Sequence, residues 1–264
     1  MNLIFTTIII SFVIAFLLGC LLGFFKKIFH VHEDEKIIQI RKALPNGNCG
    51  GCGFAGCASF AEAVAAGKAP ANGCTAGGAT VAKAIAAILD EEIDAENYIA
   101  VLACQGSKDH AQQRGYYNGV KSCKAAALAI NGTKMCQFGC IGLGDCVKAC
   151  KFDAIEMRPD GIPYIDKEKC TGCTMCMKAC PHHLLQKIPV SQKAPFVMCS
   201  SRSENKPALI KDCKTSCIKC KKCERDCEQG AITFENNLPV IDAKKCNQCR
   251  KCVEGCPRGV IQFL

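Results

Sequence analysis

The most apolar part of the chain is its beginning. Residues 3–25 contain no charged side chain, and these twenty-three residues in a helix rising about 1.5 Å each would span the hydrocarbon core of a membrane with some tilt. We therefore predict a transmembrane helix at residues 1–28. No basic segment precedes the run and no small-residue cleavage site follows it, which is atypical of a cleaved signal peptide.

Two lysines, Lys26 and Lys27, follow the apolar run directly. The positive-inside rule places such a flank in the cytoplasm. We therefore expect a single-pass protein of the cytoplasmic (inner) membrane, with the rest of the chain on the cytoplasmic side. That compartment is reducing, so cysteine thiols there stay free of disulfides.

The next stretch has the pattern of a small helical domain, at residues 29–90. An amphipathic stretch ends at Leu44, and residues 58–66 and 79–89 are alanine-rich, as short helices often are. Between them lies a glycine-rich C-x2-C-x4-C-x16-C pattern, whose glycines let the backbone approach a cluster. We expect a [4Fe–4S] cluster on its four cysteines: Cys49, Cys52, Cys57 and Cys74.

The rest of the chain contains an internal repeat. The run Cys170-x2-Cys173-x2-Cys176-x3-Cys180-Pro returns 76 residues later, beginning at Cys246. The repeat also includes the segments upstream of the cysteines, so a duplicated module is the simplest interpretation. We predict an α+β fold with a connecting segment at 91–130, dicluster ferredoxin modules at 131–190 and 213–264, and a linker at 191–212.

The repeated run has the ligand spacing of bacterial [4Fe–4S] ferredoxins, in which the fourth cysteine binds the neighbouring cluster. Each copy has an upstream partner run, regular from Cys217 and irregular (C-x3-C-x5-C-x3-C) from Cys136. The crossed-ligand rule then predicts four sets: Cys136, Cys140, Cys146 and Cys180; Cys170, Cys173, Cys176 and Cys150; Cys217, Cys220, Cys223 and Cys256; and Cys246, Cys249, Cys252 and Cys227. Zinc is the alternative, but it favours two separate cysteine pairs.

Composition agrees with cluster binding. The chain has 25 cysteines and no tryptophan among 264 residues, so clusters rather than large apolar cores must stabilise the cysteine-rich modules. The formal charge is +9, but each oxidised cluster with its thiolates carries about −2. Five such clusters bring the charge close to zero, which argues against a nucleic-acid partner.

The sequence lacks the groups of a bond-making active site. It contains no Walker A motif and no dinucleotide fingerprint after a predicted strand, and its five histidines have no ligand spacing. We therefore expect a protein that moves electrons and has no catalytic residues of its own.

Five cysteines remain outside these motifs. Cys20 lies in the predicted membrane helix, where it is best explained as a small apolar side chain. Four others equal the ligand count of one more cluster: Cys104, Cys123, Cys199 and Cys213. Five clusters are expected; these four cysteines either bind a sixth or are ordinary buried thiols.

The order of motifs resembles a known family. A membrane helix, the segment Leu44–Cys57, Ala103-Cys104-Gln105-Gly106-Ser107, the irregular run from Cys136 and paired ferredoxin modules together are similar to the B subunit of the Rnf complex, a membrane-bound ferredoxin:NAD+ oxidoreductase. The resemblance covers nearly the whole chain.

The resemblance implies a function and partners. It implies an iron–sulfur subunit that accepts electrons from soluble ferredoxin and relays them to the other, membrane-embedded Rnf subunits during ion translocation. The alternatives are a stand-alone membrane-tethered polyferredoxin serving another reductase, and a scaffold with structural clusters. Three lysines of the second module form a candidate ferredoxin-docking face, unless they only offset cluster charge: Lys219, Lys221 and Lys222.

Overall fold

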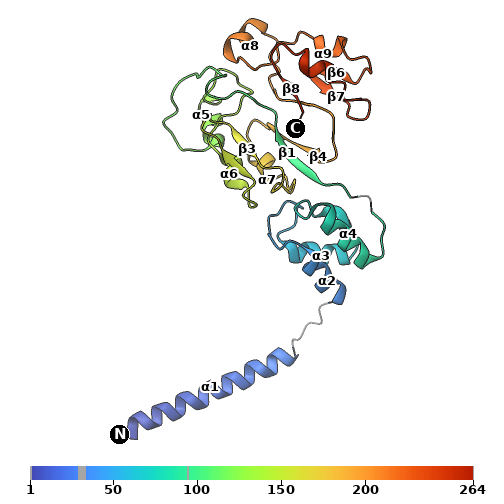
Figure 1. Ribbon diagram of the computed structural model, residues 1–264. Helices are drawn as coiled ribbons and strands as arrows, with labels where there is room; N and C mark the ends of the chain where they lie inside the picture. The colour runs from blue at the N-terminus through green and yellow to red at the C-terminus, as the bar shows by residue number, and fades with distance from the viewer. Residues whose placement is uncertain (1, 29–33, 94, 264) are drawn as a thin grey trace.

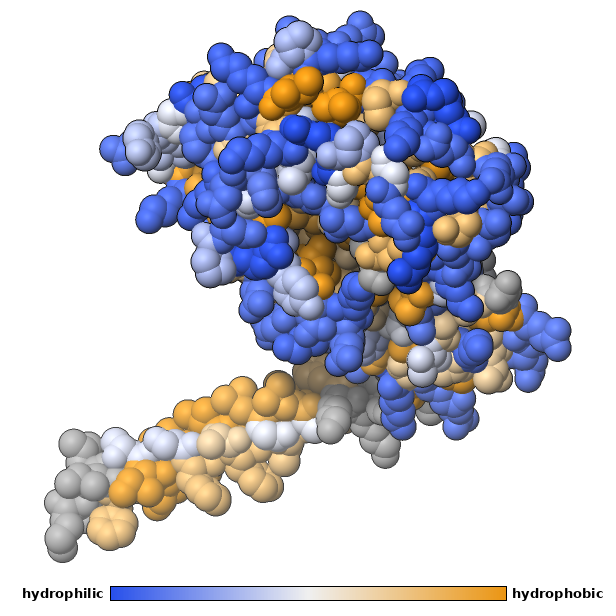
Figure 2. Space-filling model, turned by 45° about the horizontal axis from the view of Figure 1, so that its top comes forward, coloured by the Kyte–Doolittle hydropathy of each residue, from blue (hydrophilic) through white to orange (hydrophobic). Residues whose placement is uncertain are grey.

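The first helix of the structure, a computed structural model, is the apolar N-terminal segment. The structure describes residues 2–28, 34–93 and 95–263, so residues 29–33 at the start of the predicted helical domain lie outside it. Helix α1 spans Asn2–Ile28, and its segment Phe5–Phe25 is long and apolar enough to cross a membrane. Figure 2 shows this helix as an apolar rod beside a mostly polar surface. The predicted membrane helix is confirmed as a helix of suitable length and composition.

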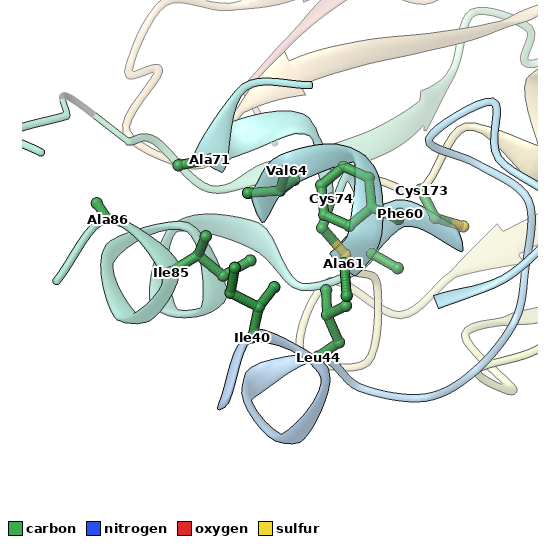
Figure 3. Close-up of a cluster of buried hydrophobic side chains, with 11 residues drawn as sticks. Ile40, Leu44, Phe60, Ala61, Val64, Ala71, Cys74, Ile85, Ala86 and Cys173 are labelled. Atoms are coloured by element: carbon green, nitrogen blue, oxygen red, sulfur yellow. The ribbon is translucent and has the colours of Figure 1, made fainter. Parts of the chain in front are cut away.

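The segment after α1 folds into a small helical domain. Its elements are α2 (Glu35–Ala43), α3 (Cys57–Ala65), the short 3-10 helix η1 (Ala71–Gly73) and α4 (Gly78–Leu89). Asp34 caps α2 by accepting a hydrogen bond from the Lys36 amide at 2.9 Å. The helices bury a compact apolar core around Ile40, Phe60 and Ile85, seen in Figure 3.

The first ferredoxin module contains two antiparallel strand pairs and three short helices. Its elements are β1 (Tyr98–Leu102), α5 (Cys123–Ile130), α6 (Asp145–Ala149), β2 (Ile155–Met157), β3 (Pro163–Ile165), α7 (Met175–Ala179) and β4 (Leu185–Pro189). Strand β2 pairs with β3, and β1 pairs with β4 from Tyr98↔Pro189 to Leu102↔Leu185. The predicted connecting segment therefore supplies a strand and a helix to the module.

The second ferredoxin module repeats this plan. Its elements are β5 (Phe196–Val197), α8 (Lys206–Asp212), α9 (Lys222–Arg225), β6 (Ile232–Glu235), β7 (Leu238–Ile241), α10 (Lys251–Glu254) and β8 (Ile261–Gln262). Strand β6 pairs with β7 and β5 with β8. Strand β5 thus comes from the predicted linker, as β1 comes from the connecting segment.

Matching hydrogen bonds relate the two modules. The Asp166 amide donates to the Ala154 carbonyl at 2.8 Å, and the Asp242 amide donates to the Ala231 carbonyl at the same distance. The amides of Cys170 and Cys246 then donate to the carbonyls of these two aspartates, at 3.0 and 3.1 Å. The main chain entering each cysteine run therefore has the same geometry, as expected for a duplication.

The three cysteine-containing units follow one another in space (Figure 1), with the helical domain against the first module and the second module beyond it. Gly51 makes the first contact possible. A Cβ atom at Gly51 would lie 2.9 Å from the Cys173 carbonyl oxygen and 2.8 Å from Thr75 Oγ1. Cys173 itself packs into the apolar core of the helical domain.

Candidate iron–sulfur sites

The four motif cysteines of the helical domain face one cavity. Its lining includes Cys49, Cys52, Cys57 and Cys74 together with glycines of the loop. The Asn48 side chain accepts a hydrogen bond from the Cys57 amide at 2.8 Å and so holds the loop against the start of α3. Burial raises the pKa of Cys74, the Gly77 and Ala76 amides oppose the rise, and the thiolates of Cys52 and Cys57 add to it.

The second module places its first predicted set around another cavity. The lining includes three cysteines of one run and one of the other, namely Cys217, Cys220, Cys223 and Cys256. The Val260 amide donates to Cys256 Sγ at 3.4 Å, a bond of the kind that tunes cluster ligands. This arrangement has the crossing that the ferredoxin spacing predicts.

Two further sets are recognised by their electrostatic neighbours. Burial raises the pKa of Cys176 to about 12, and the thiolates of Cys170, Cys173, Cys146 and Cys150 add to the rise. In the second module, burial and the thiolates of Cys246, Cys249 and Cys227 raise the pKa of Cys252, while its own amide opposes them. Cys150 and Cys227 thus lie beside the runs that the crossed-ligand rule assigns to them.

The predicted set of Cys136, Cys140, Cys146 and Cys180 has electrostatic neighbours from outside the motifs. Burial raises the pKa of Cys146 to about 11, and the thiolates that add to the rise are Cys123 and Cys180. Burial also raises the pKa of Cys136 to about 11; the Phe138 amide opposes it, and the thiolates that add to it are Cys104, Cys199 and Cys213. Cys136 therefore lies among cysteines outside the motifs, and Cys123 lies beside the set from which Cys136 is missing.

The sequence also relates Cys136 to a cysteine of the second module. At an offset of 77 residues Cys140, Cys146 and Cys150 correspond to Cys217, Cys223 and Cys227, and Leu143 corresponds to Cys220. The same offset carries Cys136 onto Cys213, which is not part of the regular run. The irregular spacing of the first run is thus a regular run that lacks its middle cysteine and is preceded by one extra cysteine.

Backbone amides donate hydrogen bonds to several of the cysteine sulfurs. Within residues 2–28, 34–93 and 95–263, no three His, Cys, Asp or Glu side chains converge on one ion-sized site. Backbone amides donate instead to cysteine sulfurs, for example Ala100 to Cys170 at 3.3 Å and Leu184 to Cys180 at 3.4 Å, as they do around iron–sulfur clusters.

Neighbouring cysteine sets lie close together along the molecule. Cys173 has Cys49 of the helical domain among its electrostatic neighbours, and Cys176 has Cys146. Farther along, the Cys140 amide donates to Cys104 Sγ at 3.4 Å, and the Cys217 amide donates to Cys199 Sγ at 3.4 Å. The cysteine sets therefore form one continuous series from the helical domain to the second module.

Lys219 is buried, which for this lysine favours the alternative of offsetting cluster charge over ferredoxin docking. Its side chain is buried, its residue exposure is 9%, and its ammonium donates to the Ser201 carbonyl. Burial lowers the pKa of Lys219, and the thiolates of Cys217, Cys199 and Cys136 oppose that decrease. Lys221 and Lys222 are exposed, as a docking face requires.

Comparisons with known proteins match the cysteine-rich segments to iron–sulfur families. Residues 44–76 match the family described as "Putative Fe-S cluster", and residues 139–184 and 216–261 each match the family described as "4Fe-4S dicluster domain". The second family begins at residue 139, after Cys136. The chain therefore binds [4Fe–4S] clusters, which supply one-electron transfer when bound.

Relatives similar over most of the chain identify the family. The B subunit of the ion-translocating oxidoreductase complex of Methanosarcina acetivorans is 39% identical over 233 residues, covering 88% of this chain and 88% of the relative. This chain belongs to the family of Rnf B subunits. The B subunit of the Na(+)-translocating ferredoxin:NAD(+) oxidoreductase complex of Acetobacterium woodii is 39% identical, covering 88% of the chain and 70% of the relative. The B subunit of the proton-translocating ferredoxin:NAD(+) oxidoreductase complex of Clostridium ljungdahlii is 37% identical, covering 92% of the chain and 85% of the relative.

The family assignment resolves the general function. As an Rnf B subunit the chain is an iron–sulfur electron-transfer subunit of a membrane-associated, ion-translocating oxidoreductase complex. The predicted fold class is confirmed, because an apolar N-terminal helix, an iron–sulfur domain and two dicluster domains occur in the predicted order. A stand-alone polyferredoxin and a purely structural scaffold are disfavoured by the same assignment.

Proposed function

We propose that this Rnf B subunit accepts electrons from a reduced soluble ferredoxin at its second module and relays them through its cysteine sets to the helical domain. From there the electrons pass to the other subunits of a ferredoxin:NAD+ oxidoreductase. The proposal follows the series of neighbouring sets that runs from Cys217 to Cys49. The chain's own residues hold the clusters, orient them and limit water access; they make and break no bonds.

The entry point is supported by ligand exposure. Among the motif cysteines of the described ranges, Cys220 and Cys249 are exposed, and both belong to the second module. Electron transfer to a soluble partner requires a cluster near the surface. Exposed lysines lie next to Cys220, namely Lys221 and Lys222, and a basic surface steers acidic partners such as soluble ferredoxins. This exposure is the observation that carries the proposal.

The exit point is the helical domain. Its cysteine set follows α1 in the chain and packs against the first module through Gly51 and Cys173. If α1 crosses the membrane with Lys26 and Lys27 on the cytoplasmic side, all cysteine sets lie on that side. The helical domain is then the unit tied most directly to the membrane, where the partner subunits lie.

Charge reversal tests the entry point. The double variant Lys221→Glu/Lys222→Glu should slow reduction of the full-length protein by ferredoxin about tenfold at low salt, because charge complementarity raises association rates. The dependence of the rate on salt should also weaken. Stopped-flow absorbance of the clusters measures both effects.

A matched control uses two exposed lysines of the first module. Lys151→Glu/Lys178→Glu changes the net charge equally but leaves the second module intact. Its rate should remain within about twofold of wild type. Equal slowing by both double variants would show a general charge effect. Unchanged kinetics in Lys221→Glu/Lys222→Glu would refute the proposal that ferredoxin docks at this surface.

A further inference from the structure

We propose a sixth [4Fe–4S] site between the two ferredoxin modules, ligated by Cys104, Cys136, Cys199 and Cys213, with Cys123 completing the first module's site beside Cys140, Cys146 and Cys180. This set is named the bridging site. It differs from the expected sixth set because Cys123 and Cys136 exchange places. The site stands on its own geometry; its role as an electron relay rests on the proposed function.

The four cysteines come from separate segments that meet between the modules. Cys104 follows β1, Cys199 follows β5, and Cys213 ends α8. A Cβ atom built on Gly106 would lie 3.5 Å from Cys104 Sγ and 3.7 Å from Cys213 Sγ, so both sulfurs approach the same point. Cys136 has Cys104, Cys199 and Cys213 as its electrostatic neighbours.

The four positions obey the duplication. The Cys140 amide donates to Cys104 Sγ and the Cys217 amide donates to Cys199 Sγ, both at 3.4 Å. Cys136 precedes Cys140 by four residues, as Cys213 precedes Cys217. Each module therefore contributes two equivalent cysteines to the bridging site.

The surroundings of the bridging site favour a buried anion. Lys134 and Lys219 are only 4% and 9% exposed, and neither takes part in the ion pairs found among the described residues. Their ammonium groups donate to the carbonyls of Gly106 and Ser201, each two residues after a bridging cysteine. A buried cation without a counter-ion is unfavourable. A cluster of charge near −2 supplies that counter-ion.

Two unsatisfied donors point the same way. Within the described ranges, Ser201 Oγ and Arg258 Nε are buried without a hydrogen-bond partner. Arg258 also donates from its guanidinium to the Cys213 carbonyl at 2.6 Å. The sulfur atoms of a cluster and its ligands are acceptors for such donors. Arg258 also lines the second-module cavity beside Cys217 and Cys256, so Ser201 is the donor specific to the bridging site.

Cys123 is held where the first module lacks a ligand. It begins α5, whose N-cap Ser122 donates to Asp145 Oδ2 at 2.8 Å and so ties the helix to the start of α6. Cys123 packs in one apolar cluster with Leu143, the residue at the position of Cys220 in the second module. The thiol from α5 thus occupies the neighbourhood of the missing middle cysteine.

The exchange of Cys123 and Cys136 is tested by counting irons in variants that all lack Cys199 and Cys213. The full-length double variant Cys199→Ala/Cys213→Ala should lose the bridging site, so that anaerobically reconstituted protein in detergent falls from about 24 to about 20 irons per chain. Adding Cys136→Ala should cause no further loss. Adding Cys123→Ala should remove further iron or convert a cluster to a three-iron form visible by electron paramagnetic resonance.

The outcomes separate the possible ligand sets. If Cys136→Ala removes further iron and Cys123→Ala does not, the exchange is wrong. If the double variant keeps the iron content of wild type, there is no bridging cluster. Cys20→Ala is the matched control and should lose no iron. The counts do not depend on electron transfer, so a failure of the proposed electron path leaves them unchanged.

Discussion

The two ferredoxin modules have the same main-chain plan but different ligand sources. In the second module a single regular run supplies Cys217, Cys220 and Cys223. In the first module the middle position of that run is Leu143, and Cys123, which is 20 residues earlier, lies beside the same site. With the ligands that we propose, the fold preserves the location of a cluster site while the segment that supplies one ligand changes.

The modules also differ in the apolar cores that surround their cysteines. The first module contains a buried cluster that includes Leu102, Ile155 and Leu185, and α5 adds another. Among the described residues, no buried cluster is formed from the second module alone. The second module should therefore depend more on its clusters for folding.

Removal of iron should have the largest effect on stability, and the second module should lose more protection from hydrogen exchange than the first. After anaerobic chelation of the clusters, we expect amides of the β6–β7 hairpin to exchange at least about a hundredfold faster relative to holoprotein, because two-stranded hairpins are marginal alone. The β2–β3 hairpin should lose less protection. Hydrogen-exchange mass spectrometry measures both peptides, and equal loss in the two hairpins would contradict the difference in cores.

Moving the ligand back to its regular position should restore a cluster. Cys123→Ala should lose up to about four irons, and Cys123→Ala/Leu143→Cys should recover them, because position 143 corresponds to Cys220 of the second module. Iron and acid-labile sulfide analysis measures the recovery. Cys123→Ala/Leu128→Cys is the control. Leu128 lies on α5, as Cys123 does, but it is 83% exposed, so a cysteine there faces away from the site. Equal recovery in the control would refute the correspondence.

The buried lysines should have a smaller, electrostatic effect. Lys134→Met and Lys219→Met should each lower the midpoint potential of the bridging site by an amount on the order of 50 mV, because loss of a buried positive charge disfavours the reduced form. A redox titration followed by electron paramagnetic resonance measures the shift. The Lys221 side chain is 57% exposed, and its ammonium pairs with Glu224 at 3.8 Å. Lys221→Met should therefore shift the midpoint potential several times less. An increase in potential would reverse the predicted sign.

Most of the fold can be predicted from local patterns. The apolar run defines α1, alanine-rich stretches define α3 and α4 to within one residue, and the repeat predicts paired modules. Strands β1 and β5 escape prediction, because two to five residues without alternation have no distinctive pattern. They form only because β4 and β8 lie beside them, and such long-range pairing is not encoded locally.

The candidate sites can be predicted where all ligands lie in regular runs. The exception is Cys136, whose proximity in sequence to Cys140 predicts a different site from the one that we propose. In the structure, the electrostatic neighbours of Cys136 include Cys104, Cys199 and Cys213, which are distant from it in sequence. The equivalence of Cys136 and Cys213 is present in the repeat, but it becomes visible only with the offset that aligns the upstream runs.

The central claim is that six cluster sites form one unbroken series through the chain. Anomalous diffraction at the iron edge from crystals of the anaerobically reconstituted full-length protein tests it most directly. The account predicts six iron peaks, with one between the two ferredoxin modules, surrounded by Cys104, Cys136, Cys199 and Cys213. Five peaks, with none between the modules and Cys136 bound beside Cys146, would contradict it.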